Sequence, residues 1–112
     1  MDRFTVSVAT AERGGTVVTA AGELDMAAAQ DLWRELEPRL AGGTRVVLDG
    51  TGLTFLDSSG LRILLQAVKV AAADGADFRI VAPQPPIQRV FDLAGVGDRL
   101  PQRDSVQAAF AD

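Results

Sequence analysis

Hydrophobic and polar residues alternate in two short segments near the start of the chain. Residues 4–9 read Phe-Thr-Val-Ser-Val-Ala, and residues 16–20 repeat much of this alternation. A period of two is typical of a strand with one buried face. Gly14 and Gly15 lie between the two segments, and a pair of glycines is a turn signal. The pattern therefore predicts a β-hairpin.

The spacing becomes helical after Asp25, which is placed to accept backbone N–H groups as an N-cap. The apolar stripe of this predicted helix consists of Ala29, Leu32, Trp33, Leu36 and Leu40. Because Trp33 belongs to the stripe, we assign it to the core rather than to a ligand site. Pro38 is expected to perturb the helix late, and Gly42 and Gly43 to stop it.

The middle of the chain predicts a strand, a helix and a second strand. Residues 45–49 are an apolar run without alternation, which is typical of a central strand covered on both faces. A Gly-rich loop is expected to follow it. The buried stripe of the next helix is predicted to be Leu61, Leu64, Leu65, Val68 and Ala72. This helix should end near Asp74 and Gly75, and residues 78–82 should form a strand parallel to the first.

Two further helices are predicted towards the end of the chain. Pro85 and Pro86 open the first of them, and Gly95 closes it. Its expected buried stripe is Ile87, Val90, Phe91 and Ala94. Residues 104–107, Asp-Ser-Val-Gln, resemble a capping box for a short last helix. We find no linker or internal repeat, so residues 1–112 are expected to form a single domain.

Charge and hydropathy narrow the possible partners. The net charge is −4, and the basic residues are scattered rather than gathered in a stripe, so direct binding to nucleic acid is not expected. No apolar run approaches the roughly 18 residues of a membrane span, and the start of the chain lacks the apolar stretch of a signal peptide. We therefore expect a cytoplasmic protein that does not associate with a membrane.

The absence of two residue types limits the possible chemistry. The chain contains no cysteine and no histidine, which excludes disulfides, thiolate chemistry and a Ser-His-Asp triad. Neither a P-loop nor a dinucleotide-binding glycine motif is present, and the only lysine, Lys69, lies on the polar face of its predicted helix. The sequence thus predicts no catalytic residue, no metal, no cofactor and no small-molecule substrate, and hence no enzyme.

The segment Asp57-Ser58-Ser59-Gly60, at the start of the middle helix, allows two interpretations. On the first, these residues only cap the helix by accepting its free N–H groups. One residue suffices for a cap, however, and here three polar residues stand between the apolar residues 55–56 and Leu61, which can anchor the loop. On the second interpretation, a serine hydroxyl carries a phosphate, which the positive end of the helix dipole favours. A phosphate would add about −1.5 to −2 charge beside Asp57 and is expected to release a partner without unfolding the chain.

At this point the sequence resembles the STAS domain family, and specifically the small bacterial anti-sigma factor antagonists. The resemblance rests on residues 22–25 (Gly-Glu-Leu-Asp), 46–49 (Val-Val-Leu-Asp), 55–61 (Phe-Leu-Asp-Ser-Ser-Gly-Leu) and 90–96 (Val-Phe-Asp-Leu-Ala-Gly-Val). It implies an α/β fold with a mixed sheet of four or five strands and about four helices, without catalytic activity. Ala28 stands where family members often carry Thr or Ser, so this chain lacks the hydroxyl at that position.

The resemblance also implies a function. The family's phosphorylated serine matches Ser58, with Ser59 as the alternative, and the kinase is the partner itself, an anti-sigma factor serine/threonine protein kinase. The unphosphorylated chain would bind this kinase and free a sigma factor, and phosphorylation would block binding. The expected partner-binding residues are Asp25, Asp57, Ser58, Ser59, Gly60, Leu61 and Arg62. Asp25 is equally well explained as a cap, Asp49 is assigned to a turn or cap, and the free protein is expected to be a monomer.

The resemblance is also compatible with a second function. STAS domains also occur as regulatory or scaffolding subunits of stress-signalling complexes and of lipid-transport ABC systems, and the fold would be the same. Such a subunit would co-purify with an ATPase, whereas an antagonist would gain a phosphate on serine when it is incubated with its kinase and ATP.

Overall fold

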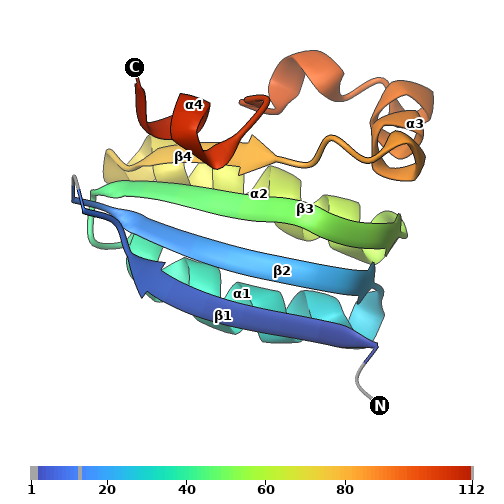
Figure 1. The fold of residues 1–112 in the computed structure, drawn as a ribbon, viewed down its shortest axis with the longest axis horizontal. Helices are drawn as coiled ribbons and strands as arrows, with labels where there is room; N and C mark the ends of the chain where they lie inside the picture. Colours follow the sequence, from blue (N-terminus) through green and yellow to red (C-terminus); the bar gives the residue numbers. More distant parts are fainter. Residues whose placement is uncertain (1–2, 13, 112) are drawn as a thin grey trace.

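The computed structural model describes residues 3–12 and 14–111. The elements in this part of the chain are β1 (Phe4–Thr10), β2 (Thr16–Leu24), α1 (Met26–Leu40), β3 (Arg45–Leu56), α2 (Ser58–Asp74), β4 (Asp77–Val81), α3 (Pro85–Ala94), the short 3-10 helix η1 (Gly97–Arg99) and α4 (Val106–Ala111). The strands form one sheet in the order β1-β2-β3-β4 (Figure 1). The predicted α/β class, with a mixed sheet and four helices, is confirmed.

The sheet combines an antiparallel hairpin with parallel strands. β1 and β2 are antiparallel in unbroken register, from Phe4 opposite Gly22 to Thr10 opposite Thr16. β3 is parallel both to β2 and to β4, so it lies inside the sheet as expected. Gly15, directly before β2, has a φ of 90°, a conformation that glycine adopts without strain.

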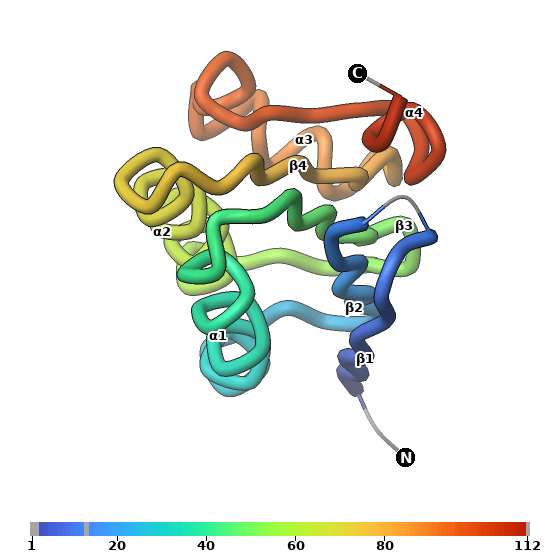
Figure 2. Tube along the Cα trace, turned by 90° about the vertical axis from the view of Figure 1, so that its left-hand side faces the viewer, coloured from blue at the N-terminus to red at the C-terminus, as the bar shows by residue number. Residues whose placement is uncertain are grey.

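The helices cover the two faces of the sheet unequally. α1 and α2 lie against one face, and α4 lies on the other side near β4 (Figure 2). Under α4, a small cluster forms from Val47, Val81 and Ala109. On the same side, β1 and β2 have no helix over them (Figure 1), and their residues Ser7 and Thr19 are exposed. The main core therefore lies between the sheet and the pair of helices α1 and α2.

The three predicted buried stripes differ in part from those observed. In α1, Trp33 of the predicted stripe is half-buried and packs against the core, and Ala28 is buried in addition. The buried residues of α2 are Gly60, Leu64, Ala67 and Ala71. Of the predicted stripe, only Leu64 is buried, and Ala72 is exposed. Apolar residues cover more than half of this helix, so periodicity alone does not fix which stripe faces the sheet. In α3, Ile87 and Phe91 are buried as predicted, but Ala94 is exposed.

Two predicted boundaries also change, at β3 and at the last helix, whereas α1 ends close to its predicted stop. The Gly-rich loop expected after residue 49 does not form, because β3 continues to Leu56. Gly50 is buried within this strand, and the register with β2 shifts twice, so β3 contains irregularities of the β-bulge kind. Pro38 lies inside the last turn of α1 and does not end the helix before Leu40. At the short last helix, Ser105 rather than Asp104 accepts the capping bond, from the Ala108 N–H at 3.0 Å.

Asp77 joins two arginines at the beginning of β4. Its Oδ2 accepts from Arg45 Nε at 2.9 Å, and its Oδ1 accepts from Arg79 Nε at 3.1 Å. Arg79, which is buried, also donates from Nη1 to the Ala109 carbonyl at 3.1 Å and so ties α4 to the sheet. Burial raises the pKa of the Asp77 carboxyl, but the hydrogen bonds from Arg79 and Arg45 outweigh burial, so this pKa lies below its ordinary value.

We expect Asp77→Asn to lower the free energy of unfolding by about 1–3 kcal/mol at neutral pH, because buried Arg79 loses its carboxylate. A carboxyl whose pKa is lowered by folding stabilises the protein above its unfolded value, near pH 4, and this contribution is lost as the pH falls through the folded value. Denaturant unfolding of the wild-type chain and of Asp77→Asn between neutral pH and about pH 3 should therefore show that the gap between their free energies of unfolding narrows in acid. Asp74→Asn removes the same charge at an exposed site and is the control. A gap that stays constant in acid would contradict the role of Asp77.

Candidate phosphorylation site

The N-termini of α1 and α2 lie side by side at the carboxyl ends of β2 and β3. Leu24 and Leu56, the last residues of these parallel strands, are opposite each other in the register. Each strand is followed directly by an aspartate, Asp25 after β2 and Asp57 after β3, and each aspartate directly precedes a helix. The Asp57 N–H donates to the Leu24 carbonyl at 3.4 Å and links the two turns. Strand pairing thus brings the two predicted aspartates to one edge of the sheet.

Both aspartates cap their helices. Asp25 Oδ1 accepts from the Ala28 N–H at 3.0 Å. Asp57 Oδ1 accepts from the Ser59 N–H at 2.9 Å and from the Gly60 N–H at 3.1 Å. Asp25 and Asp57 therefore act as N-caps, as the sequence predicts. It follows that two of the N–H groups expected to attract a phosphate on α2 already bind the Asp57 carboxylate.

The two serines differ in their accessibility. Ser58 is the first residue of α2 and is exposed, whereas Ser59 is half-buried. The cap uses the Asp57 carboxylate and leaves the Ser58 hydroxyl aside; within residues 3–12 and 14–111 no hydrogen bond to this hydroxyl is found. Of the two candidate phosphoacceptors, Ser58 is thus the more exposed residue.

Gly60 brings the first turn of α2 into close contact with the sheet. A Cβ atom at this position would lie 2.5 Å from Leu56 Cδ1 and 2.7 Å from the Leu24 carbonyl oxygen. Real Cβ atoms do not approach other heavy atoms this closely, so no larger side chain fits without movement. Gly60 therefore fixes the first turn of α2 against the sheet, while Ser58 in the same turn is exposed.

The other two predicted partner-binding residues follow on α2. Leu61 is half-buried and packs against the main core, so only part of it is available to a partner. Arg62 is exposed and lies four residues after Ser58, which places both on one face of the helix. Of the predicted partner-binding residues, Ser58 and Arg62 are thus exposed and Gly60 is buried. The others are half-buried: Asp25, Asp57, Ser59 and Leu61.

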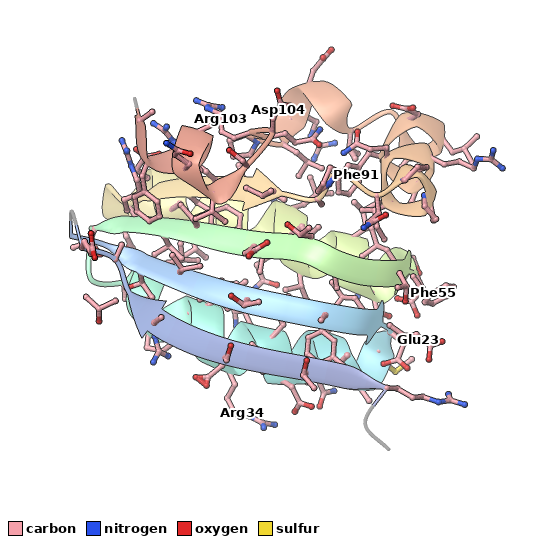
Figure 3. The ribbon with its side chains drawn as sticks, in the orientation of Figure 1. Glu23, Arg34, Phe55, Phe91, Arg103 and Asp104 are labelled. Carbon is pink, nitrogen blue, oxygen red and sulfur yellow. The ribbon has the colours of Figure 1, made fainter. Side chains whose placement is uncertain are left out.

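Two exposed apolar residues beside the loop were not among the predicted site residues. Met26, the first residue of α1, is 67% exposed, and Phe55, near the end of β3, is 46% exposed. Phe55 is opposite Glu23 in the register, and Figure 3 shows the two at the same end of the sheet. The expectation that residues 55 and 56 both anchor the loop is correct for Leu56 and wrong for Phe55, because neighbouring strand residues point to opposite faces.

Metal-binding groups, membrane-spanning helices and clefts are the other features to consider among the described residues. Among them, no group of three or more Asp, Glu, His or Cys is placed to hold a metal ion. None of the helices in this part of the chain is both long and apolar enough to cross a membrane. A cleft of about 390 Å³ is lined by residues that include Gly15, Arg45, Asp77 and Phe110, at the opposite end of the strands from Ser58. The Ser58 loop, which is Asp57 and the first turn of α2, lies outside this cleft and beside the exposed side chains of Met26 and Phe55. Exposed apolar residues next to polar ones are typical of protein–protein contacts.

Comparison with known proteins gives consistent results. A family model described as "Mlab, STAS domain" matches residues 8–102. An anti-sigma F factor antagonist of Paenibacillus polymyxa is 27% identical over 95 residues, which cover 83% of this chain and 81% of the relative. The crystal structure of an anti-sigma factor antagonist from Mycobacterium paratuberculosis superposes with a TM-score of 0.82 at 28% identity, over 95% of this chain and 90% of that chain.

A further solved structure shares only the fold. The Bacillus cell fate determinant SpoIIAA in its phosphorylated form gives a TM-score of 0.70 at 23% identity, over 93% of this chain and 96% of that chain. The mixed sheet, the paired helix N-termini and the family model that spans most of the sequence agree with one another. The chain belongs to the STAS domain family.

Proposed function

We propose that this chain is an anti-sigma factor antagonist whose binding is controlled by phosphorylation of Ser58. The relatives that carry this name support the proposal. The observation that carries it is the position of Ser58, exposed on the first turn of a helix that Asp57 caps and Gly60 fixes to the sheet. An exposed hydroxyl on a rigid support is accessible to a kinase, and its modification requires no unfolding.

The phosphoryl transfer needs a hydroxyl from this chain and the remaining chemistry from the partner. The Ser58 oxygen attacks the γ-phosphorus of ATP, the bond from that phosphorus to the bridging oxygen breaks, and ADP leaves. The hydroxyl proton passes to a base of the kinase, because protein kinases carry an aspartate that accepts the proton of the substrate hydroxyl. The products are phosphoserine and ADP. We therefore propose an anti-sigma factor that is itself a serine/threonine protein kinase as the partner.

The surroundings of Ser58 explain why a phosphate would release the partner. Phe55 and Met26 supply exposed apolar area beside the serine, which a docked protein would cover. A phosphate would place about −1.5 to −2 charge next to the Asp57 carboxylate and within this area. The Ser59 and Gly60 N–H groups already bind Asp57, so they are not free to neutralise the added charge. Covering two neighbouring anionic groups with a partner is costly, and dissociation follows.

The proposal is tested by incubating the chain with its anti-sigma kinase and Mg-ATP, followed by peptide mass spectrometry. We expect one phosphate on Ser58, no phosphate on Ser58→Ala, and normal phosphorylation of the matched variant Ser59→Ala. Phosphate on Ser59 of the wild-type chain would contradict the choice of serine. Absence of any phosphate, together with co-purification of the chain with a transport ATPase, would favour a regulatory subunit of a transport system instead.

A further inference from the structure

The two edges of the sheet are treated differently by the rest of the chain. The outer edge of β4 is covered, because the Ile80 N–H donates to the Pro101 carbonyl at 3.0 Å and the Arg103 N–H donates to the Ile80 carbonyl at 2.9 Å. β1 is the last strand at the other edge, and no segment of the described residues pairs with its outer side (Figure 1). The backbone groups on that side of β1 are thus available to another strand.

β1 lacks the features that usually prevent edge strands from pairing. Its residues Phe4–Thr10 include no charged residue and no proline, and its register with β2 contains no bulge. Phe4, Val6 and Val8 share the face of β1 that is turned towards α1. Val8 nevertheless remains 36% exposed. The strand therefore combines an open backbone edge with apolar side chains that its own fold covers only in part.

We propose that β1 pairs with β1 of a second copy of this chain, antiparallel and centred on Ser7, so that the two sheets become one. In this register Val6 is opposite Val8 of the second copy, and Phe4 is opposite Thr10. Apolar and β-branched pairs across antiparallel strands stabilise a sheet, and here they would cover the exposed part of Val8. The proposal departs from the monomer expected from the sequence alone.

The sequence of this edge fits a second copy. Residues 6–8, Val-Ser-Val, read the same in both directions, so a twofold axis at Ser7 places each valine opposite a valine. The next pair outwards is Thr5 opposite Ala9, two small residues. The strand carries no charge that would repel its copy, although the chain has a net charge of −4. In this register Arg3, whose Nε lies 3.8 Å from Glu23 Oε2 of its own chain, is opposite the uncharged Ala11 of the second copy.

The border of α1 near this edge is also compatible with self-association. Arg34 lies at this border in Figure 3, and its Nη1 is 3.2 Å from Asp31 Oδ1. The border thus presents both signs of charge, so two copies related by a twofold axis do not meet like charges alone. The Ser58 loop follows β3 at the end of the sheet and takes no part in the pairing. The proposed pair of chains and the proposed phosphorylation can therefore fail independently.

Sedimentation velocity from micromolar to hundreds of micromolar chain tests the proposal. We expect a monomer–dimer equilibrium for the wild-type chain. Ser7→Lys places like charges opposite each other at the axis and should raise the dissociation constant at least about tenfold. The matched control is Thr19→Lys, because Thr19 is exposed and lies opposite Ser7 on β2, one strand away from the edge. This control should retain the wild-type equilibrium.

The register is tested by mixing two charge variants. Ser7→Lys and Ser7→Glu should each be largely monomeric, and an equimolar mixture should form heterodimers, because the opposite charges then meet at the axis. Circular dichroism serves as the control and should show that both variants are folded, because Ser7 is exposed. A wild-type monomer at every concentration would overturn the proposal and leave the edge to an extended segment of another protein. Dimers that persist in Ser7→Lys, or a mixture that stays monomeric, would overturn it as well.

Discussion

Ser58→Glu is expected to bind the anti-sigma factor about a hundredfold more weakly than the wild-type chain. The new carboxylate stands next to Asp57, and docking transfers both groups from water to an interface. Two unit charges about 4 Å apart repel by about 1 kcal/mol in water and by about 4 kcal/mol at an effective dielectric constant near 20. The increase of about 3 kcal/mol corresponds to roughly two decades in the dissociation constant. Titration calorimetry against the kinase with ADP measures the change.

Three further variants separate charge from bulk and from net charge. Ser58→Gln has nearly the shape of Ser58→Glu without the charge, and it should lose much less affinity. Ser58→Ala should bind like the unmodified chain because the cap does not use the Ser58 hydroxyl. Gln107→Glu gives the same net charge on an exposed residue of α4 and should leave binding unchanged. Equal affinities for all of these proteins would exclude the switch, and equal losses in Ser58→Gln and Ser58→Glu would exclude its electrostatic cause.

Local signals in the sequence predict most of the elements. The hairpin follows from alternation before and after a glycine pair, and both aspartate caps follow from their place directly before a helical stripe. Gly75 and Gly95 end α2 and α3 in the left-handed conformation, as their positions predict. These features depend on a few neighbouring residues, so they are visible in the chain before any tertiary contact is known.

The features that the sequence does not predict depend on contacts between distant segments. Gly50 and Gly52 resemble a loop, but β3 resumes its pairing with β2 at Gly52, opposite Ala21, so both glycines stay within the strand. That extension places Phe55 and Leu56 on alternate sides of a strand, which exposes Phe55 and adds it to the candidate site. The choice of Gly60, rather than Leu61, as a buried residue of α2 likewise follows from the close approach of this helix to Leu24. Spacing along the helix alone does not contain this information.

The candidate site was largely predictable because capping and strand order determine it together. Asp57 identifies the start of α2, and the parallel pairing of β2 with β3 brings Asp25 to the same edge. The sequence does not predict that Ser58 is more accessible than Ser59, because this difference depends on how α2 is rotated on the sheet. Gly60 sets this rotation, so the best test of the geometry of the site is a change at Gly60.

Gly60→Ala is expected to lower the free energy of unfolding by about 1–2 kcal/mol, although alanine in a helix interior is favoured over glycine by about 1 kcal/mol. The added Cβ would lie 2.7 Å from the Leu24 carbonyl oxygen and 2.5 Å from Leu56 Cδ1. A leucine side chain can turn away, but the Leu24 carbonyl belongs to the backbone of β2 and cannot. Relief therefore requires the first turn of α2 to move away from the sheet. Urea unfolding measures the loss.

Gly97→Ala is the matched control, because Gly97 has an ordinary φ and no atom within 4 Å of the position of an added Cβ. Its stability should stay within about 0.5 kcal/mol of the wild-type value. Movement of α2 would also displace Asp57 and Ser58, since the Gly60 N–H donates to Asp57. Gly60→Ala should therefore bind the kinase more weakly even where it is fully folded, whereas Gly97→Ala should not. A Gly60→Ala protein as stable as the wild-type chain, with unchanged affinity, would show that close packing of this glycine does not position the serine.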